Sequence, residues 1–136
     1  MKKSIWRIMD ANFNRAREGL RVCEDILRFE RNEAQLTANL KSIRHQLDHT
    51  LHQNRVLTKS LLGARKSFRD VGKKSYIRNG RKTNYSDLLT ANFKRTEEAL
   101  RVLEECSKIA LPAATRHFQT IRFKIYELEK KIITKF

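Results

Sequence analysis

Residues 10–25 read DANFNRAREGLRVCED, and residues 90–105 read TANFKRTEEALRVLEE, so one segment occurs twice, eighty positions apart. The two copies share nine of their sixteen residues, namely Ala, Asn, Phe, Arg, Glu, Leu, Arg, Val and Glu at matched places. A shared helical periodicity alone would match the apolar positions and leave the polar positions free to differ. The polar positions match as well, which indicates two related halves; the matched pairs are Asn12/Asn92, Arg15/Arg95, Glu18/Glu98, Arg21/Arg101 and Glu24/Glu104.

Around each copy, apolar residues recur every three or four positions, which is the spacing of one helical face. The first periodic run covers residues 4–30, and a second covers residues 36–51 and extends on to 57 in its longest form. In the second half, a third run ends near Pro112, and a fourth begins at about residue 113. The sequence therefore predicts an all-α fold in which a duplicated helical hairpin forms a four-helix bundle about a pseudo-twofold axis.

A chain of 136 residues fits one domain without disulfide or metal support. We expect a single helical domain over 1–136, with repeat 1 at 1–58, a linking loop at 59–85 and repeat 2 at 86–136. The glycines of the linking segment favour a loop over a fifth long helix. Loops of this length in a compact domain are often functional, and a plain crossover that spans the bundle is the alternative interpretation.

The formal net charge of +15 predicts a surface that attracts anions, whether nucleic acid, acidic protein, anionic membrane or a phosphorylated metabolite. Charge alone does not choose among these ligands. The most electropositive stretch is residues 59–82, which contains nine basic residues and one acid, Asp70. The basic residues are Lys59, Arg65, Lys66, Arg69, Lys73, Lys74, Arg78, Arg81 and Lys82.

Cysteine usage and hydropathy predict a reduced, cytoplasmic protein with no membrane partner. Cys23 and Cys106 are the only cysteines, and neither lies in a CxxC pair. Charged residues interrupt every apolar run that follows Met1, so no signal peptide or membrane span is expected. His45, His49 and His52 have a spacing that suits a metal pair in principle, but a solvated helix face explains the same spacing, and no metal site is predicted.

The doubled polar residues are the first candidates for a binding site. On a helical wheel Asn12 lies within the apolar stripe of the first helix, and Asn92 lies at the matching place in the third. We expect the two amides to approach each other or a common ligand near the pseudo-axis, with core asparagines bonded to helix backbone as the alternative. Arg15 and Arg95 lie one turn further along, where their guanidinium groups could grip phosphate oxygens.

The remaining charged candidates have structural alternatives of their own. Glu18 and Glu98 follow these arginines by three residues, so intrahelical ion pairs account for them without a ligand. Arg21, Glu24, Arg101 and Glu104 point more to the outside, where a structural role is expected.

In the linking segment, ARKSFRDVGK at residues 64–73 offers Arg69 and Asp70 to clamp a phosphate and orient a metal or a hydroxyl, beside Gly72. No GxxxxGK[ST], GxGxxG or HExxH motif is present, and no catalytic residue is predicted. The predicted substrate-binding set is Asn12, Arg15, Glu18, Asn92, Arg95, Glu98, Arg69 and Asp70.

Four segments together resemble one family. RIMDANFNRAREGLRVCEDILRF (7–29), LKSIRHQLD (40–48), GARKSFRDVG (63–72) and TANFKRTEEALRVLEE (90–105) are similar to the helical domain at the N-terminus of some two-domain thiamine-phosphate synthases, which is sometimes found alone. The resemblance implies a role in thiamine biosynthesis, where this domain is commonly proposed to be an alternative hydroxymethylpyrimidine phosphate kinase. Such a kinase would use ATP and Mg²⁺.

Two departures from the family qualify what the resemblance implies. In fused members a barrel domain follows and condenses the pyrimidine diphosphate with thiazole phosphate. The present sequence ends at Phe136, so we expect a stand-alone helical domain without synthase activity. The stretch KKSYIRNGRK (73–82) is more basic than the family pattern.

The leading hypothesis is therefore a protein of thiamine biosynthesis that binds or phosphorylates hydroxymethylpyrimidine phosphate. A non-catalytic partner of a separate thiamine-phosphate synthase is the alternative, and a homodimer is compatible with either. Nucleic-acid binding ranks last, because few aromatic residues accompany the basic ones and no recognition motif is present.

Overall fold

The computed structural model describes residues 2–53, 55–73 and 84–136. Within these ranges all regular secondary structure is helical, which confirms the all-α prediction. The elements are α1 (Lys2–Asp25), the π-helical turn η1 (Ile26–Glu30), α2 (Ala34–His52), α3 (Arg55–Ala64), the 3₁₀ turn η2 (Ser67–Arg69), α4 (Tyr85–Ala110), the 3₁₀ turn η3 (Pro112–Ala114) and α5 (Thr115–Lys135). The basic stretch at 74–83 lies outside the described residues.

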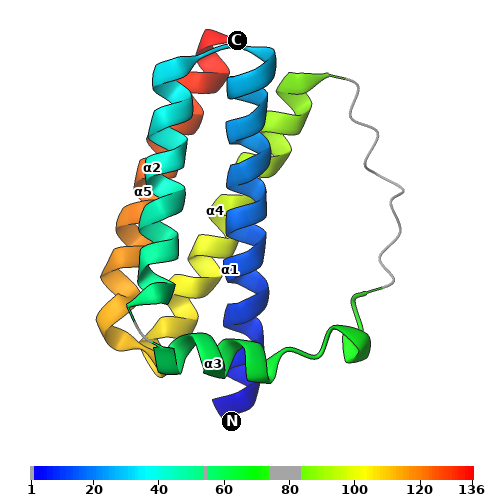
Figure 1. Cartoon of the computed structure of the whole chain (residues 1–136), viewed down its shortest axis with the longest axis vertical. Helices are drawn as coiled ribbons and strands as arrows, with labels where there is room; N and C mark the ends of the chain where they lie inside the picture. The colour runs from blue at the N-terminus through cyan, green and yellow to red at the C-terminus, as the bar shows by residue number, and fades with distance from the viewer. Residues whose placement is uncertain (1, 54, 74–83) are drawn as a thin grey trace.

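The four long helices stand side by side along the long axis of the molecule, and α3 lies across the end near the N-terminus (Figure 1). Helix α1 packs against α4 and α2, and α5 packs against α4 and α2. The two hairpins, α1–α2 and α4–α5, therefore meet most closely through the helices that carry the repeated segment. None of the helices in the described ranges is both long enough and apolar enough to pass through a lipid bilayer.

The ends of the helices follow local sequence signals. Asn32 adopts φ 54 between η1 and α2, a left-handed conformation that asparagine tolerates better than most residues. Asn84 caps α4, because its Oδ1 accepts a hydrogen bond of 2.8 Å from the amide of Asp87. Pro112 begins η3 directly after α4, which agrees with the predicted end of a helix near this proline.

The prediction of a loop beginning at residue 59 is wrong in its first part. Helix α3 occupies Arg55–Ala64, and η2 follows it at Ser67–Arg69. The helix forms because Leu61 and Ala64 are buried, with 3% and 4% of their surface exposed. Gly63 does not end it, since the surrounding space is open and its backbone is helical.

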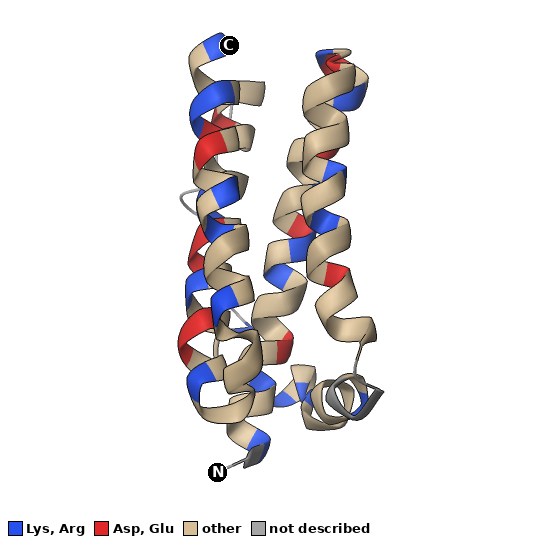
Figure 2. Ribbon diagram, turned by 90° about the vertical axis from the view of Figure 1, so that its left-hand side faces the viewer, with Lys and Arg blue, Asp and Glu red and all other residues tan. Residues whose placement is uncertain are grey.

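The core fills the space between the four long helices. Phe13 of α1 meets Phe118 of α5 edge to face, with ring centroids 5.6 Å apart. Fully buried side chains from every long helix surround this pair, among them Met9, Leu20, Leu40, Leu47, Phe93, Leu100, Leu103, Ile121 and Ile125. Basic and acidic residues are interspersed along the described helices (Figure 2).

Helices α1 and α4 come into close backbone contact. Thr96 Oγ1 donates a hydrogen bond of 2.9 Å to the carbonyl of Asn92 and lies 3.5 Å from the carbonyl of Ala16 across the interface. A β-carbon at Gly19 would lie 3.0 Å from the Asn92 carbonyl and would overlap Thr96 Oγ1. Glycine at this position is what lets the two helices come this near.

Candidate functional site

The two repeated asparagines have the same conformation but do not meet. Both are buried, and each Nδ2 donates a hydrogen bond of 2.8 Å to the carbonyl four residues earlier, that of Ile8 for Asn12 and of Leu88 for Asn92. Since α1 and α4 run in opposite directions and cross near Ala16 and Thr96 (Figure 1), each asparagine lies four residues before the crossing. At about 1.5 Å rise per residue the two are roughly 12 Å apart along the helices, so each amide serves its own helix.

The charged residues of the repeats lie on the surface. Arg15 and Glu18 are exposed, as are Arg95 and Glu98. Arg15 Nη1 lies 3.4 Å from Oδ1 of Asn12, so the structure does bring this predicted pair together. The intrahelical pairs Arg15–Glu18 and Arg95–Glu98 are absent from the ion pairs of the described ranges.

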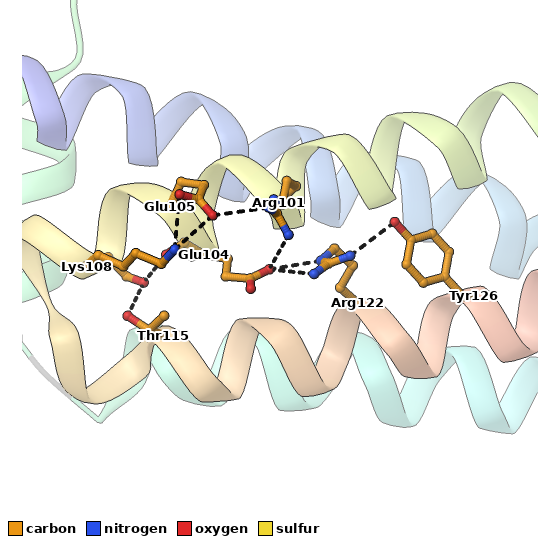
Figure 3. Close-up of polar contacts among 8 residues, drawn as sticks. Arg101, Glu104, Glu105, Lys108, Thr115, Arg122 and Tyr126 are labelled. Atoms are coloured by element: carbon orange, nitrogen blue, oxygen red, sulfur yellow. Dashed lines mark hydrogen bonds and ion pairs between the residues drawn. The ribbon is translucent and has the colours of Figure 1, made fainter.

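Two acids that were expected to point outward are instead buried. Glu24 is 3% exposed and Glu104 is 4% exposed. Glu24 Oε2 accepts a hydrogen bond of 2.8 Å from Nε of Arg44, and Glu104 Oε2 accepts one of 2.9 Å from Nε of Arg122 (Figure 3). Arg122 also donates to the hydroxyl of Tyr126 at 3.3 Å. Each hairpin is thus fastened by the same buried ion pair between its two helices.

The electrostatics of this pair favour the charged carboxylate. Burial alone would raise the pKa of Glu24, but the hydrogen bonds and the charge of Arg44 outweigh burial, so the pKa of Glu24 is lowered from its ordinary value. The sequence carried a signal for the pair, because Ile-Arg recurs at 43–44 and 121–122. Matching these arginines to the repeated glutamates would have identified both bonds.

The two halves differ at position 97 of α4, where the second copy has an acid and the first copy has an arginine. Glu97 occupies the place of Arg17 in the first copy, and its surface is only 4% exposed. Lys94 Nζ lies 3.3 Å from Glu97 Oε1 and 3.1 Å from Glu129 Oε1. Burial and, next, the neighbouring Glu129 carboxylate together raise the pKa of Glu97 to about 7, against the opposing effect of Lys94. In the first half Arg17 instead pairs with Asp48 at 2.6 Å.

The predicted residue Asp70 lines a small hollow where the segment after α3 passes over α1. This inner hollow has a volume of about 150 Å³. Arg65 crosses its edge and binds Asp10 through two hydrogen bonds, Nε to Oδ2 and Nη2 to Oδ1, each 2.7 Å long. Asp70 Oδ1 accepts a hydrogen bond of 2.8 Å from the amide of Gly72, which closes a turn. The residues around the inner hollow are Arg7, Asp10, Ala11, Asn14, Arg65, Lys66, Ser67 and Asp70.

The other predicted loop residue, Arg69, lines a second hollow beside the first. This outer hollow has a volume of about 590 Å³ and is lined by Leu62, Arg65, Lys66, Ser67, Phe68 and Arg69. Residues 65–67 line both hollows, so the two lie against the same stretch of chain. The structure therefore brings Arg69 and Asp70 to one place, together with Asp10 and Arg65, which the repeat pattern did not single out.

The charges around the two hollows favour an anion. Four cations and two carboxylates line them, which leaves a net charge of +2; they are Arg7, Arg65, Lys66 and Arg69 against Asp10 and Asp70. Arg65 is neutralised by Asp10, whereas the other three cations form no ion pair with any residue that the structure describes. Their donors are available to a ligand.

The histidines and cysteines lie elsewhere. His45, His49 and His117 line a hollow of about 590 Å³ between α2 and α5. Among residues 2–53, 55–73 and 84–136, no group of three or more histidines, cysteines or acids is placed to hold a metal ion. Cys23 is buried, and burial together with nearby carboxylates raises the pKa of its thiol to about 12, so it is a weak nucleophile.

Known proteins resemble this chain over nearly its whole length. A model of the ThiD2 family matches residues 7–131. The thiamine-phosphate synthase of Nostoc punctiforme is 37% identical over 134 residues, which are 98% of this chain and 36% of that protein. The thiamine-phosphate synthases of Thermosynechococcus vestitus and Synechocystis sp. are each 39% identical, over 93% and 96% of this chain and 34% and 36% of their own lengths. The chain thus spans about a third of these relatives. No solved structure matches it.

Proposed function

This chain belongs to the ThiD2 family, and from that membership we propose that it acts in thiamine biosynthesis, where it binds hydroxymethylpyrimidine phosphate and transfers a phosphoryl group to it. An oxygen of the substrate's phosphate attacks the terminal phosphorus of a nucleoside triphosphate, and the nucleoside diphosphate leaves. The products are the pyrimidine diphosphate ester and the nucleoside diphosphate.

The observation that carries the proposal is the pair of hollows with its net charge of +2. A phosphate monoester carries close to two negative charges at neutral pH, so the charges match. Lys66 and Arg69 line the outer hollow and have no carboxylate partner among the described residues, so both can donate hydrogen bonds to phosphate oxygens. The Asp10–Arg65 bond anchors the segment that carries them to α1.

This residue set suits phosphoryl transfer, which depends mainly on positioning and on cations near the transferred group. The nucleophile is already an anionic oxygen of the substrate, so the reaction needs no strong base from the protein. In the part of the chain that the structure describes, both oxygens of Asp10 are bound by Arg65, and one oxygen of Asp70 is bound by Gly72. The second oxygen of Asp70 fits a Mg²⁺ ion that is carried mostly by nucleotide phosphates, which is the usual arrangement for this ion.

Calorimetry with hydroxymethylpyrimidine phosphate tests binding, and a coupled assay with ATP and Mg²⁺ tests turnover. We expect the double substitution of Lys66→Ala and Arg69→Ala to weaken binding at least tenfold, since each charged hydrogen bond contributes about 1.5–3 kcal/mol. The matched control is the double substitution of Arg15→Ala and Arg95→Ala, which removes the same charge from the repeats and should leave binding unchanged.

Three results would count against this assignment. If the wild-type protein neither binds nor turns over the substrate, the function is wrong. If the control loses affinity and the Lys66/Arg69 variant keeps it, the ligand lies at the doubled residues of α1 and α4 instead. If both variants lose affinity equally, only the overall charge matters.

A second function is favoured by the length of the relatives. The matched segment makes up about a third of proteins named thiamine-phosphate synthase, so in those chains it is covalently joined to further sequence. We propose as the second candidate that this chain associates with a thiamine-phosphate synthase without catalysing a reaction. Sedimentation of the protein mixed with such a synthase that lacks this segment should then show a complex, and two independent species would exclude it.

A further inference from the structure

One aromatic side chain stands almost entirely in solvent at the edge of the outer hollow. Phe68 has 93% of its surface exposed, far more than the other exposed phenylalanines of the described residues, at 29, 123 and 136. It belongs to η2 and lines the outer hollow together with the cations Lys66 and Arg69. Folding gains almost nothing from a ring in this position, because hydrophobic stabilisation is proportional to the apolar area removed from water.

The ring is nevertheless held on an ordered backbone. The amide of Arg69 donates a hydrogen bond of 3.0 Å to the carbonyl of Lys66, which closes the turn under Phe68. On the N-terminal side of the turn, the Arg65–Asp10 bonds fasten the chain to α1. On the C-terminal side, Lys73 Nζ lies 4.9 Å from the centroid of the Phe68 ring and occupies one of its faces. The other face has no ring or cation partner among the described residues.

We propose that the free face of Phe68 is the stacking platform for the planar ring of a phosphorylated heterocycle, while the cations beside it hold the phosphate. This inference rests on the proposed function and specifies how that site recognises its ligand. The volumes agree with such a division, because the inner hollow of about 150 Å³ has room for a phosphate group and the outer hollow of about 590 Å³ has room for a ring. Every flat heterocycle offers a face that an aromatic side chain can stack on.

The stacking role makes a different prediction from a purely electrostatic site. A cationic site alone would bind inorganic phosphate and phosphorylated heterocycles with affinities set by their charge. A site with a stacking platform binds the phosphorylated heterocycle more tightly, and the whole of that advantage depends on Phe68. The side chain most suitable as a control is Val71, which is fully exposed in the same segment and lines neither hollow.

The experiment compares Phe68→Ala, Phe68→Trp and Val71→Ala by calorimetry. The ligands are hydroxymethylpyrimidine phosphate, uridine monophosphate as a second phosphorylated heterocycle, and inorganic phosphate. We expect Phe68→Ala to weaken binding of the heterocycles by about tenfold to a hundredfold, in line with the cost of removing one stacking side chain, and to leave inorganic phosphate unchanged. Phe68→Trp should retain or strengthen heterocycle binding, and Val71→Ala should match the wild type.

Folding does not complicate the test, since Phe68 is exposed and its replacement should leave the thermal midpoint unchanged. The inference is overturned if Phe68→Ala binds the heterocycles as the wild type does, or if it loses inorganic phosphate to the same degree. Loss of uridine monophosphate binding in Phe68→Ala, combined with no wild-type turnover of hydroxymethylpyrimidine phosphate, would support the platform and refute the kinase.

Discussion

The contact of Gly19 with Thr96 allows a quantitative test of how α1 and α4 fit together. In Gly19→Ala, the new β-carbon would lie 3.0 Å from the Asn92 carbonyl and would overlap Thr96 Oγ1. Thr96 cannot turn aside freely, because its hydroxyl is hydrogen-bonded at 2.9 Å to that same carbonyl. Overpacking of this kind costs about 1–3 kcal/mol, and replacing glycine by alanine in a helix gains about 1 kcal/mol. The difference between these two effects should lower the free energy of unfolding by up to about 2 kcal/mol.

The repeat supplies the compensating change. The repeat matches Gly19 with Ala99 and Thr96 with Ala16. The place related to the Gly19–Thr96 contact by the pseudo-twofold axis therefore holds a pair of alanines, Ala99 and Ala16. Both of those alanines are buried, with at most 1% of their surface exposed. The double variant Gly19→Ala with Thr96→Ala would recreate this pair on the other side of the axis.

Urea unfolding of the wild type, both single variants and the double variant forms a double-mutant cycle. Thr96→Ala alone should cost about 1 kcal/mol, because it removes a methyl group and a hydroxyl from a closed interface. In the double variant we expect a favourable coupling of about 1 kcal/mol or more. Effects that add to within about 0.5 kcal/mol would show that this contact does not set the approach of the two helices.

Three further predictions concern the charged groups. The pKa of Glu97 is about 7 in the folded protein against an ordinary 4.5, which gives stability that is complete below pH 4.5 and is lost as pH rises through 7. Glu97→Gln should therefore gain about 3 kcal/mol relative to the wild type between pH 4.5 and 8, and a pH-independent difference in urea unfolding would contradict this. Glu104→Gln leaves the buried Arg122 without its carboxylate and should cost about 3–5 kcal/mol by the same measurement, whereas a loss below about 1 kcal/mol would mean that the pair is solvated. Asp10→Asn removes the charged partner of Arg65 and should lower the hydrogen-exchange protection of the η2 amides, while the protection of α5 stays unchanged. Unchanged protection in η2 would show that the ion pair does not anchor the segment.

The helices were predictable because their apolar stripes are long and regular. Each of the four long helices lies within a few residues of its periodic run, and α4 ends just before Pro112, where the third run was predicted to end. Helix α3 was missed because it contains Gly63 and lies at the start of the basic, glycine-containing segment, which local pattern assigns to a loop, although half of its ten residues are apolar. Its helical state depends on burial against α1, and burial of this kind is a tertiary effect that no window of sequence reveals.

The candidate site was predictable only in part. Arg69 and Asp70 stood out because the linking segment is basic and contains a single acid, and both line the hollows. Asp10 did not stand out, since its pairing with Arg65 joins residues 55 positions apart. The two asparagines were expected to converge because a helical wheel places both in apolar stripes. A wheel shows which face of a helix a residue is on, but it does not show how far along the axis the residue lies relative to a neighbouring helix.

The comparison of the two copies separates residues that hold the fold from residues that are free to bind a ligand. Glu24 and Glu104 make the same interhelical bond in both halves, so folding accounts for these doubled acids. The Nδ2 atoms of Asn12 and Asn92 also make the same bond to their own helices, while Oδ1 of Asn92 is buried without a partner among the described residues. Asp10 has no such counterpart, because position 90 is a threonine.

The segment over α1, which contains α3 and η2, follows the first hairpin. A duplicated hairpin provides two equivalent positions, and of positions 10 and 90 only position 10 has the acid that binds this segment. We therefore expect substitutions of Lys66 and Arg69 to change ligand binding with little effect on stability, and substitutions of Glu24 and Glu104 to do the reverse.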